Sequence, residues 1–61
     1  MLYLYNLEYN VTDSNGKILS THHVGMFNDE ADIEFKKKDI LSENKNKNII
    51  FNIFIINDLL R

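Results

Sequence analysis

The sequence predicts an α+β protein with a ββαβ layout, in which one helix covers one face of a three-stranded antiparallel sheet ordered 2-1-3. Three observations predict this layout: an Asn15-Gly16 turn signal, a charged segment that begins at Asn28, and an apolar run that begins at Ile49. A chain of 61 residues has room for a single domain. The expected strands cover residues 2–12, 17–26 and 48–57, and the expected helix covers residues 28–43.

The first two strands are predicted to form a hairpin. Asn-Gly favours a two-residue type I′ turn, because both residues tolerate positive φ. Before the turn, apolar side chains alternate with mostly polar ones, at Tyr3, Tyr5, Leu7, Tyr9 and Val11. A two-residue turn also fixes the register. It pairs Ser14 with Lys17, Val11 with Ser20, Tyr9 with His22, Leu7 with Val24 and Tyr5 with Met26, and on the other face Glu8 with His23, Asn10 with Thr21 and Asn6 with Gly25.

The charged segment after the hairpin is predicted to be a helix. Asn28 or Asp29 can cap it, and the acidic residues of its first turns precede Lys36–Lys38, which is the order that a helix dipole favours. One side of the helix carries its main apolar residues, Ile33, Ile40 and Leu41. A strand over residues 31–37, as part of an all-β meander, stays open because apolar and polar residues also alternate there.

The closing run is typical of a strand, because it is short and rich in β-branched and aromatic residues. Both of its faces are apolar: Phe51, Ile53 and Ile55 form one, and Ile50, Phe54 and Ile56 form the other. One helix covers only one face, and the strand lies at the edge of the sheet. We therefore expect a homodimer, joined through this strand or back to back across the sheets, with Ile50, Phe54 and Ile56 in self-association. The alternative is that these three side chains fold over Met26 and Phe27.

The composition argues against enzymes and against metal or cofactor proteins. Cysteine is absent, which removes disulfides and thiolate metal sites, and two glycines are too few for a phosphate-binding loop. His22 and His23 are neighbours on a strand, so they point to opposite faces and are expected to have structural roles. The segment that begins at Asp13 lacks the spacing of a calcium loop. We expect no catalytic residues, no metal and no cofactor.

The sequence gives no sign of export or of a membrane segment. The first residues lack a basic flank and a continuous apolar stretch, and the run from Ile49 to Ile56 is much shorter than the ~20 residues that span a bilayer. We expect a protein of the host cell cytoplasm that has no membrane partner.

The pattern resembles that of a loose group of very small proteins from phages and prophages of AT-rich bacteria. The resemblance rests on the tyrosine-rich segment Tyr3–Tyr9, the Asn15-Gly16 turn, the charged helix and the closing segment Asn48–Ile53. It covers most of the chain and contains no invariant motif. It implies a non-enzymatic accessory protein that binds a larger host or phage protein stoichiometrically, including as an inhibitor of a host defence system such as CRISPR.

Two kinds of partner contact follow from the charged segment. For a protein partner, the expected contact residues are Asp29, Glu30, Lys36 and Lys37. The alternative is a small nucleic-acid-binding regulator that uses the cluster Lys36–Lys38 for phosphate contacts. The net charge of −2 gives no general attraction to nucleic acid, and the acidic residues next to the cluster oppose it.

Overall fold

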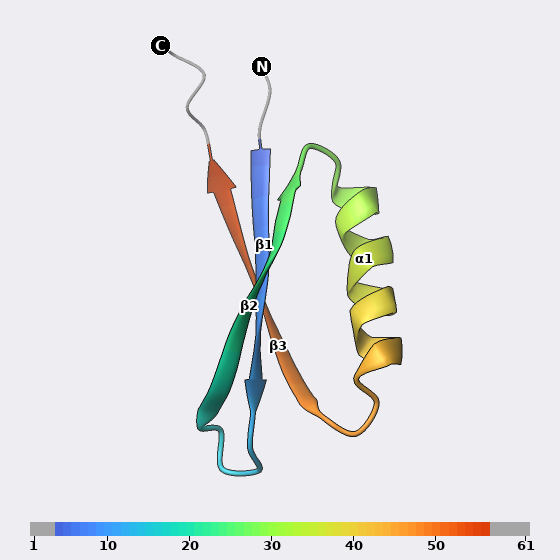
Figure 1. Cartoon of the computed structure of the whole chain (residues 1–61). Helices are drawn as coiled ribbons and strands as arrows, with labels where there is room; N and C mark the ends of the chain where they lie inside the picture. Colours follow the sequence, from blue (N-terminus) through green and yellow to red (C-terminus); the bar gives the residue numbers. More distant parts are fainter. Residues whose placement is uncertain (1–3, 57–61) are drawn as a thin grey trace.

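The computed structural model describes residues 4–56 and confirms the ββαβ layout (Figure 1). Its elements are β1 (Leu4–Thr12), β2 (Ile18–Phe27), α1 (Glu30–Glu43) and β3 (Asn48–Ile56). Both neighbours of β1 are antiparallel to it, in the order β2-β1-β3. Residues 2, 3 and 57 of the predicted strands lie outside the described residues.

The β1–β2 turn differs from the predicted type I′ turn. The N–H of Asp13 donates to the carbonyl of Lys17 over 2.9 Å, and the N–H of Gly16 donates to the carbonyl of Asp13 over 3.1 Å. The Asp13 carboxylate also accepts from the N–H groups of Asn15 and Lys17, both at 2.9 Å. Only Gly16 in the turn has positive φ, at +86°. The turn is therefore a three-residue loop stabilised by the aspartate, and the predicted Ser14–Lys17 pair is wrong.

Two irregularities in the hairpin decide which residues share a face. The first, between Val11 and Thr12, compensates for the longer turn. The predicted pairs from Val11–Ser20 to Glu8–His23 are therefore confirmed. The second, between Leu7 and Glu8, leaves Val24 as an extra residue in β2. From Leu7 back to the start of β1, the predicted register is therefore wrong by one residue. The observed pairs are Leu7–Gly25, Asn6–Met26 and Tyr5–Phe27.

Gly25 allows the second irregularity, because its φ of +150° is one that L side chains rarely adopt. A Cβ atom at Gly25 would meet nothing within 4 Å, so a substitution there tests backbone strain alone. We expect Gly25→Ala to lower the free energy of unfolding by about 1–2 kcal/mol, measured by denaturant titration followed by circular dichroism. A chemically synthesised chain with D-alanine at position 25 is the control, because D-alanine accepts positive φ. Equal stability of both alanine variants would contradict the strain argument.

The segment 31–37 is helical, so the strand alternative is wrong. Asp29 is the N-cap, and its side chain accepts a hydrogen bond from the N–H of Ala31 over 2.9 Å. The buried residues of α1 are Ile33 and Ile40, whereas Leu41 is 47% exposed. The apolar stripe of α1 is therefore narrow, with the half-buried Lys37 between its two isoleucines.

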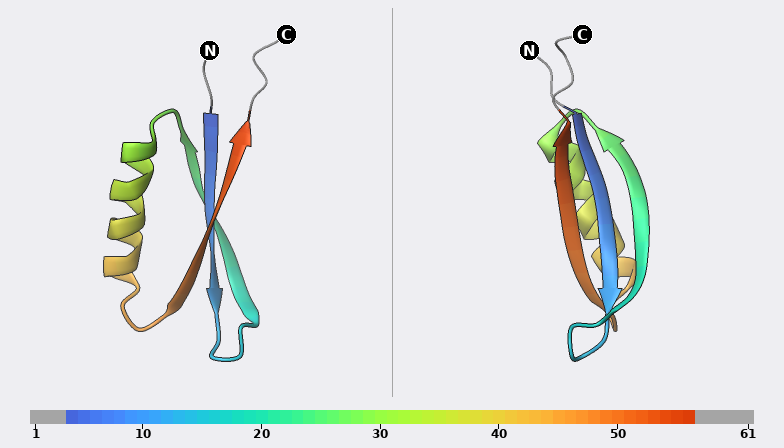
Figure 2. Two further views of the ribbon diagram at one scale, coloured as in Figure 1. Left: turned by 180° about the vertical axis from the view of Figure 1, so that it is seen from behind. Right: turned by 90° about the vertical axis from the view of Figure 1, so that its left-hand side faces the viewer.

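The core lies between α1 and one face of the sheet. On that face, Leu7 of β1 is fully buried, and the buried apolar side chains among the described residues are Leu7, Ile33 and Ile40. The right-hand view of Figure 2 shows α1 behind the sheet, and no helix within residues 4–56 covers the opposite face. A core this small leaves much of the apolar surface of the sheet exposed.

Candidate interaction surfaces

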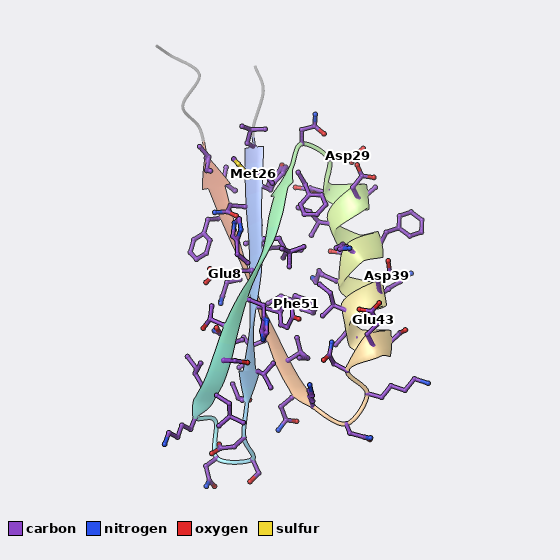
Figure 3. All side chains as sticks on the ribbon, in the orientation of Figure 1. Glu8, Met26, Asp29, Asp39, Glu43 and Phe51 are labelled. Carbon is purple, nitrogen blue, oxygen red and sulfur yellow. The ribbon has the colours of Figure 1, made fainter. Side chains whose placement is uncertain are left out.

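The face of the sheet toward α1 is only partly covered. Phe51 is half-buried and lies between the sheet and α1 (Figure 3), and the ammonium group of Lys37 lies 5.4 Å from the centre of its ring. Ile53 and Ile55, on the same face of β3, are 42% and 63% exposed. We expected one helix to cover this face. It does so only in part because the apolar stripe of α1 is narrow.

The uncovered part of this face forms a cleft of about 480 Å³. It is lined by Tyr5, Glu30, Ala31, Ile33, Glu34, Ile53 and Ile55. The floor is therefore apolar, and the two carboxylates belong to consecutive turns at the start of α1. The Tyr5 hydroxyl donates to the Glu30 carboxylate over 3.2 Å. We call this feature the acidic cleft.

The predicted partner residues Asp29, Glu30, Lys36 and Lys37 lie in different surroundings. Asp29 caps α1, and Glu30 lines the acidic cleft. Lys37 pairs with Glu34 over 3.4 Å and turns toward Phe51, whereas Lys36 is exposed. The four residues therefore do not form one continuous patch.

The lysine cluster does not gather on one surface either. Lys37 points toward the sheet, and Lys36 and Lys38 are roughly 200° apart around the helix axis. No observation on the described residues favours nucleic-acid binding, so this alternative stays an untested prediction.

The face of the sheet away from α1, which we call the open face, carries a second exposed apolar group. The register places Leu4, Met26, Ile50, Phe54 and Ile56 on it. Met26, Ile50 and Phe54 are each about half exposed, at 51%, 51% and 50%. The alternative in which the closing strand folds over Met26 and Phe27 is therefore not realised, because Met26 is itself exposed and Phe27 pairs with Tyr5 on the other face.

A polar row divides the open face. Glu8 lies between His23 of β2 and Asn52 of β3, on the side of the sheet away from α1 (Figure 3). The His23 ring bonds to the side-chain oxygen of Asn6, and Thr21 donates to Asn10 over 2.7 Å. This row separates Ile50 from the other apolar side chains of the open face, which are Leu4, Met26, Phe54 and Ile56.

The two histidines have structural contacts. The His22 ring stacks on Tyr9, with ring centres 4.8 Å apart, and it also bonds to the Ser20 hydroxyl at 2.9 Å. Among the described residues, no group of three or more histidines and acidic residues could hold a metal ion.

The outer edge of β3 has none of the features that protect edge strands. Among the described residues β3 pairs only with β1, so alternate N–H and C=O groups point outward. The strand contains no charged residue and no proline, and its pairing with β1 is unbroken over all nine residues. The other edge strand, β2, is interrupted by two irregularities. Irregularities, charges and proline are the usual protections against edge-to-edge pairing, so β3 is the accessible edge.

No protein-family model, curated protein or solved structure matches the chain. No helix within residues 4–56 is both long and apolar enough to cross a bilayer.

Sequence reasoning missed two features of these surfaces. One is the acidic cleft, which depends on how α1 is placed over the sheet. The other is the position of Met26 beside Phe54 on the open face, which depends on the irregularity at Val24. Gly25 was the signal for the second feature, because an isolated glycine inside a strand pattern indicates a bulge.

Proposed function

We propose that this protein is a non-enzymatic binding module that acts as a homodimer and occupies a site on a larger host or phage protein. The observation that supports this proposal best is the exposure of β3 on both faces, at Ile50, Ile53, Phe54 and Ile55. Exposed apolar groups of this kind mark interaction sites in soluble proteins. A protein that binds its partner stoichiometrically needs such a surface and requires no set of catalytic residues.

The open face is the proposed site for the larger partner. Leu4, Met26 and Phe54 form its apolar end, and the polar row from His23 to Asn52 offers hydrogen-bonding groups beside it. An apolar centre next to polar groups is the usual composition of a protein interface. α1 lies on the opposite side of the sheet, so its charged residues, with Glu30 and Lys36 among them, stay outside this site.

The resemblance to small phage and prophage proteins supports a more specific role, the inhibition of a host defence system. Cells that carry an active CRISPR system against a phage are expected to become sensitive to that phage when they express this protein. The plating efficiency of the phage measures the effect. Unchanged plating at full expression would count against this role without affecting protein binding in general.

Binding to a larger protein is tested with tagged wild-type protein and two lysine variants. Met26→Lys places a charge on the open face in β2, which β1 separates from β3, and should abolish retention of the partner from host lysate. Phe35→Lys is the matched control, because Phe35 is 69% exposed and lies roughly 200° around α1 from the buried Ile33. We expect wild type and Phe35→Lys to retain one protein in a fixed molar ratio. Equal retention by Met26→Lys would reject the open face as the binding site.

A further inference from the structure

We infer that two copies of the chain pair through the free edges of their β3 strands, antiparallel and centred on Asn52, so that each copy closes the acidic cleft of the other. This inference deepens the proposed homodimer and rests on it. The prediction from sequence left two arrangements open, edge pairing and stacking of the sheets back to back.

The open face disfavours back-to-back stacking. Glu8 lies in the middle row of that face, between His23 and Asn52. Stacking two open faces would remove both Glu8 carboxylates from water. His23 is the one side chain in that row that could carry a positive charge to pair with them. Burial of unpaired charge is costly. Edge pairing leaves Glu8 in contact with solvent and satisfies the outward N–H and C=O groups of β3.

The sequence of β3 selects one register. A two-fold antiparallel pair centred on Asn52 aligns all nine residues from Asn48 to Ile56 with their partners. On the open face, this register places Phe54 opposite the partner's Ile50 and Asn52 opposite the partner's Asn52. On the other face, it places Phe51 opposite the partner's Ile53 and Ile49 opposite the partner's Ile55. Every apolar side chain from Ile49 to Ile55 therefore meets an apolar one, and the amides meet each other.

The charges on α1 complement each other in this arrangement. In each copy, α1 runs opposite to β3 (Figure 1), so a two-fold axis at Asn52 places the first half of one helix beside the second half of the other. Residues 29–34 contain four acidic side chains and no basic one, whereas residues 35–43 carry Lys36, Lys37 and Lys38 together with Asp39 and Glu43. The acidic stretch of one helix thus lies beside a stretch of the other in which lysines outnumber acidic residues by three to two.

The acidic cleft faces a second lysine in this pairing. Ile53 forms part of the cleft floor, and it faces the partner's Phe51 in the proposed register. The ammonium group of Lys37 lies beside the Phe51 ring within each copy. The partner's Lys37 is therefore brought toward the mouth of a cleft whose lining includes Glu30 and Glu34, of which Glu34 also pairs with Lys37 of its own copy.

A single cysteine tests the register cleanly, because the natural sequence contains none. Only the residue at the centre of the pair faces itself, with Cα atoms about 4.5–5.5 Å apart, which suits a disulfide. Asn52→Cys treated with the thiol oxidant diamide is therefore expected to form a covalent dimer. Asn48→Cys is the matched control, since its two copies would lie roughly 26 Å apart along the strands. Ile53→Cys tests a shift of the centre by one residue, and it should crosslink far less than Asn52→Cys.

Light scattering on the untreated wild-type protein completes the experiment, and circular dichroism shows that each variant folds. A two-chain mass together with selective crosslinking of Asn52→Cys supports the inference. A one-chain mass would overturn it, while binding of the larger protein would still be judged by the Met26 experiment. A two-chain mass with crosslinking through Ile53→Cys or Asn48→Cys, or with none, would overturn the register and leave the homodimer itself standing.

Discussion

The double variant Ile50→Lys, Phe54→Lys is expected to be a monomer, with half the mass of the wild-type dimer that we propose. Both side chains are about half exposed, so a lysine at either position reaches water within a single copy. In the paired strands, each lysine would lie opposite the other copy's second lysine, and like charges directly opposite each other destabilise a strand pair. Four positive charges would then gather at the two-fold axis. Light scattering after size-exclusion chromatography measures the change.

The control for this variant is Phe35→Lys, Leu41→Lys, which adds the same charge at two exposed residues of α1, 69% and 47% accessible. It should keep the two-chain mass. Circular dichroism should show the same secondary structure for both variants. If both double variants keep the wild-type mass, β3 is not the surface of self-association.

Leu7→Ala is expected to unfold much of the protein at room temperature. Leu7 is completely buried, and only Ile33 and Ile40 accompany it among the buried apolar side chains of residues 4–56. Replacing a buried leucine by alanine costs about 2–5 kcal/mol. The core of so short a chain rarely supplies more than about 3–5 kcal/mol of net stability, so one substitution removes most of it.

Leu19→Ala is the matched control for the core substitution, because Leu19 of β2 is 61% exposed. Its free energy of unfolding should stay within about 0.5 kcal/mol of the wild-type value. Urea titration followed by circular dichroism measures both variants at one protein concentration, since the dimerisation that we propose would add to the apparent stability. Similar losses in the two leucine variants would show that the core does not centre on Leu7.

The alternation of apolar residues and the turn signal predicted the hairpin well but not in detail. The pairs from Val11–Ser20 to Glu8–His23 agree with the structure, although the turn itself was wrong. Agreement arose because an irregularity next to Thr12 offsets the extra turn residue. The longer turn is not visible from the Asn-Gly signal alone, since it goes with the hydrogen bonds that the Asp13 side chain accepts within the folded turn.

The sequence by itself determined the order of the elements, the strand order and the apolar nature of both faces of β3, because these follow from periodicity, chain direction and residue type. Only the tertiary structure decided how much of that apolar surface stays exposed. The reason is the narrow stripe of α1, where Lys37 sits between Ile33 and Ile40 and leaves Ile53 and Ile55 uncovered. The acidic cleft depends on how α1 packs over the sheet, and the place of Met26 on the open face depends on how β2 pairs with β1 next to Gly25. Both are contacts between elements, which the residue pattern within one element does not specify.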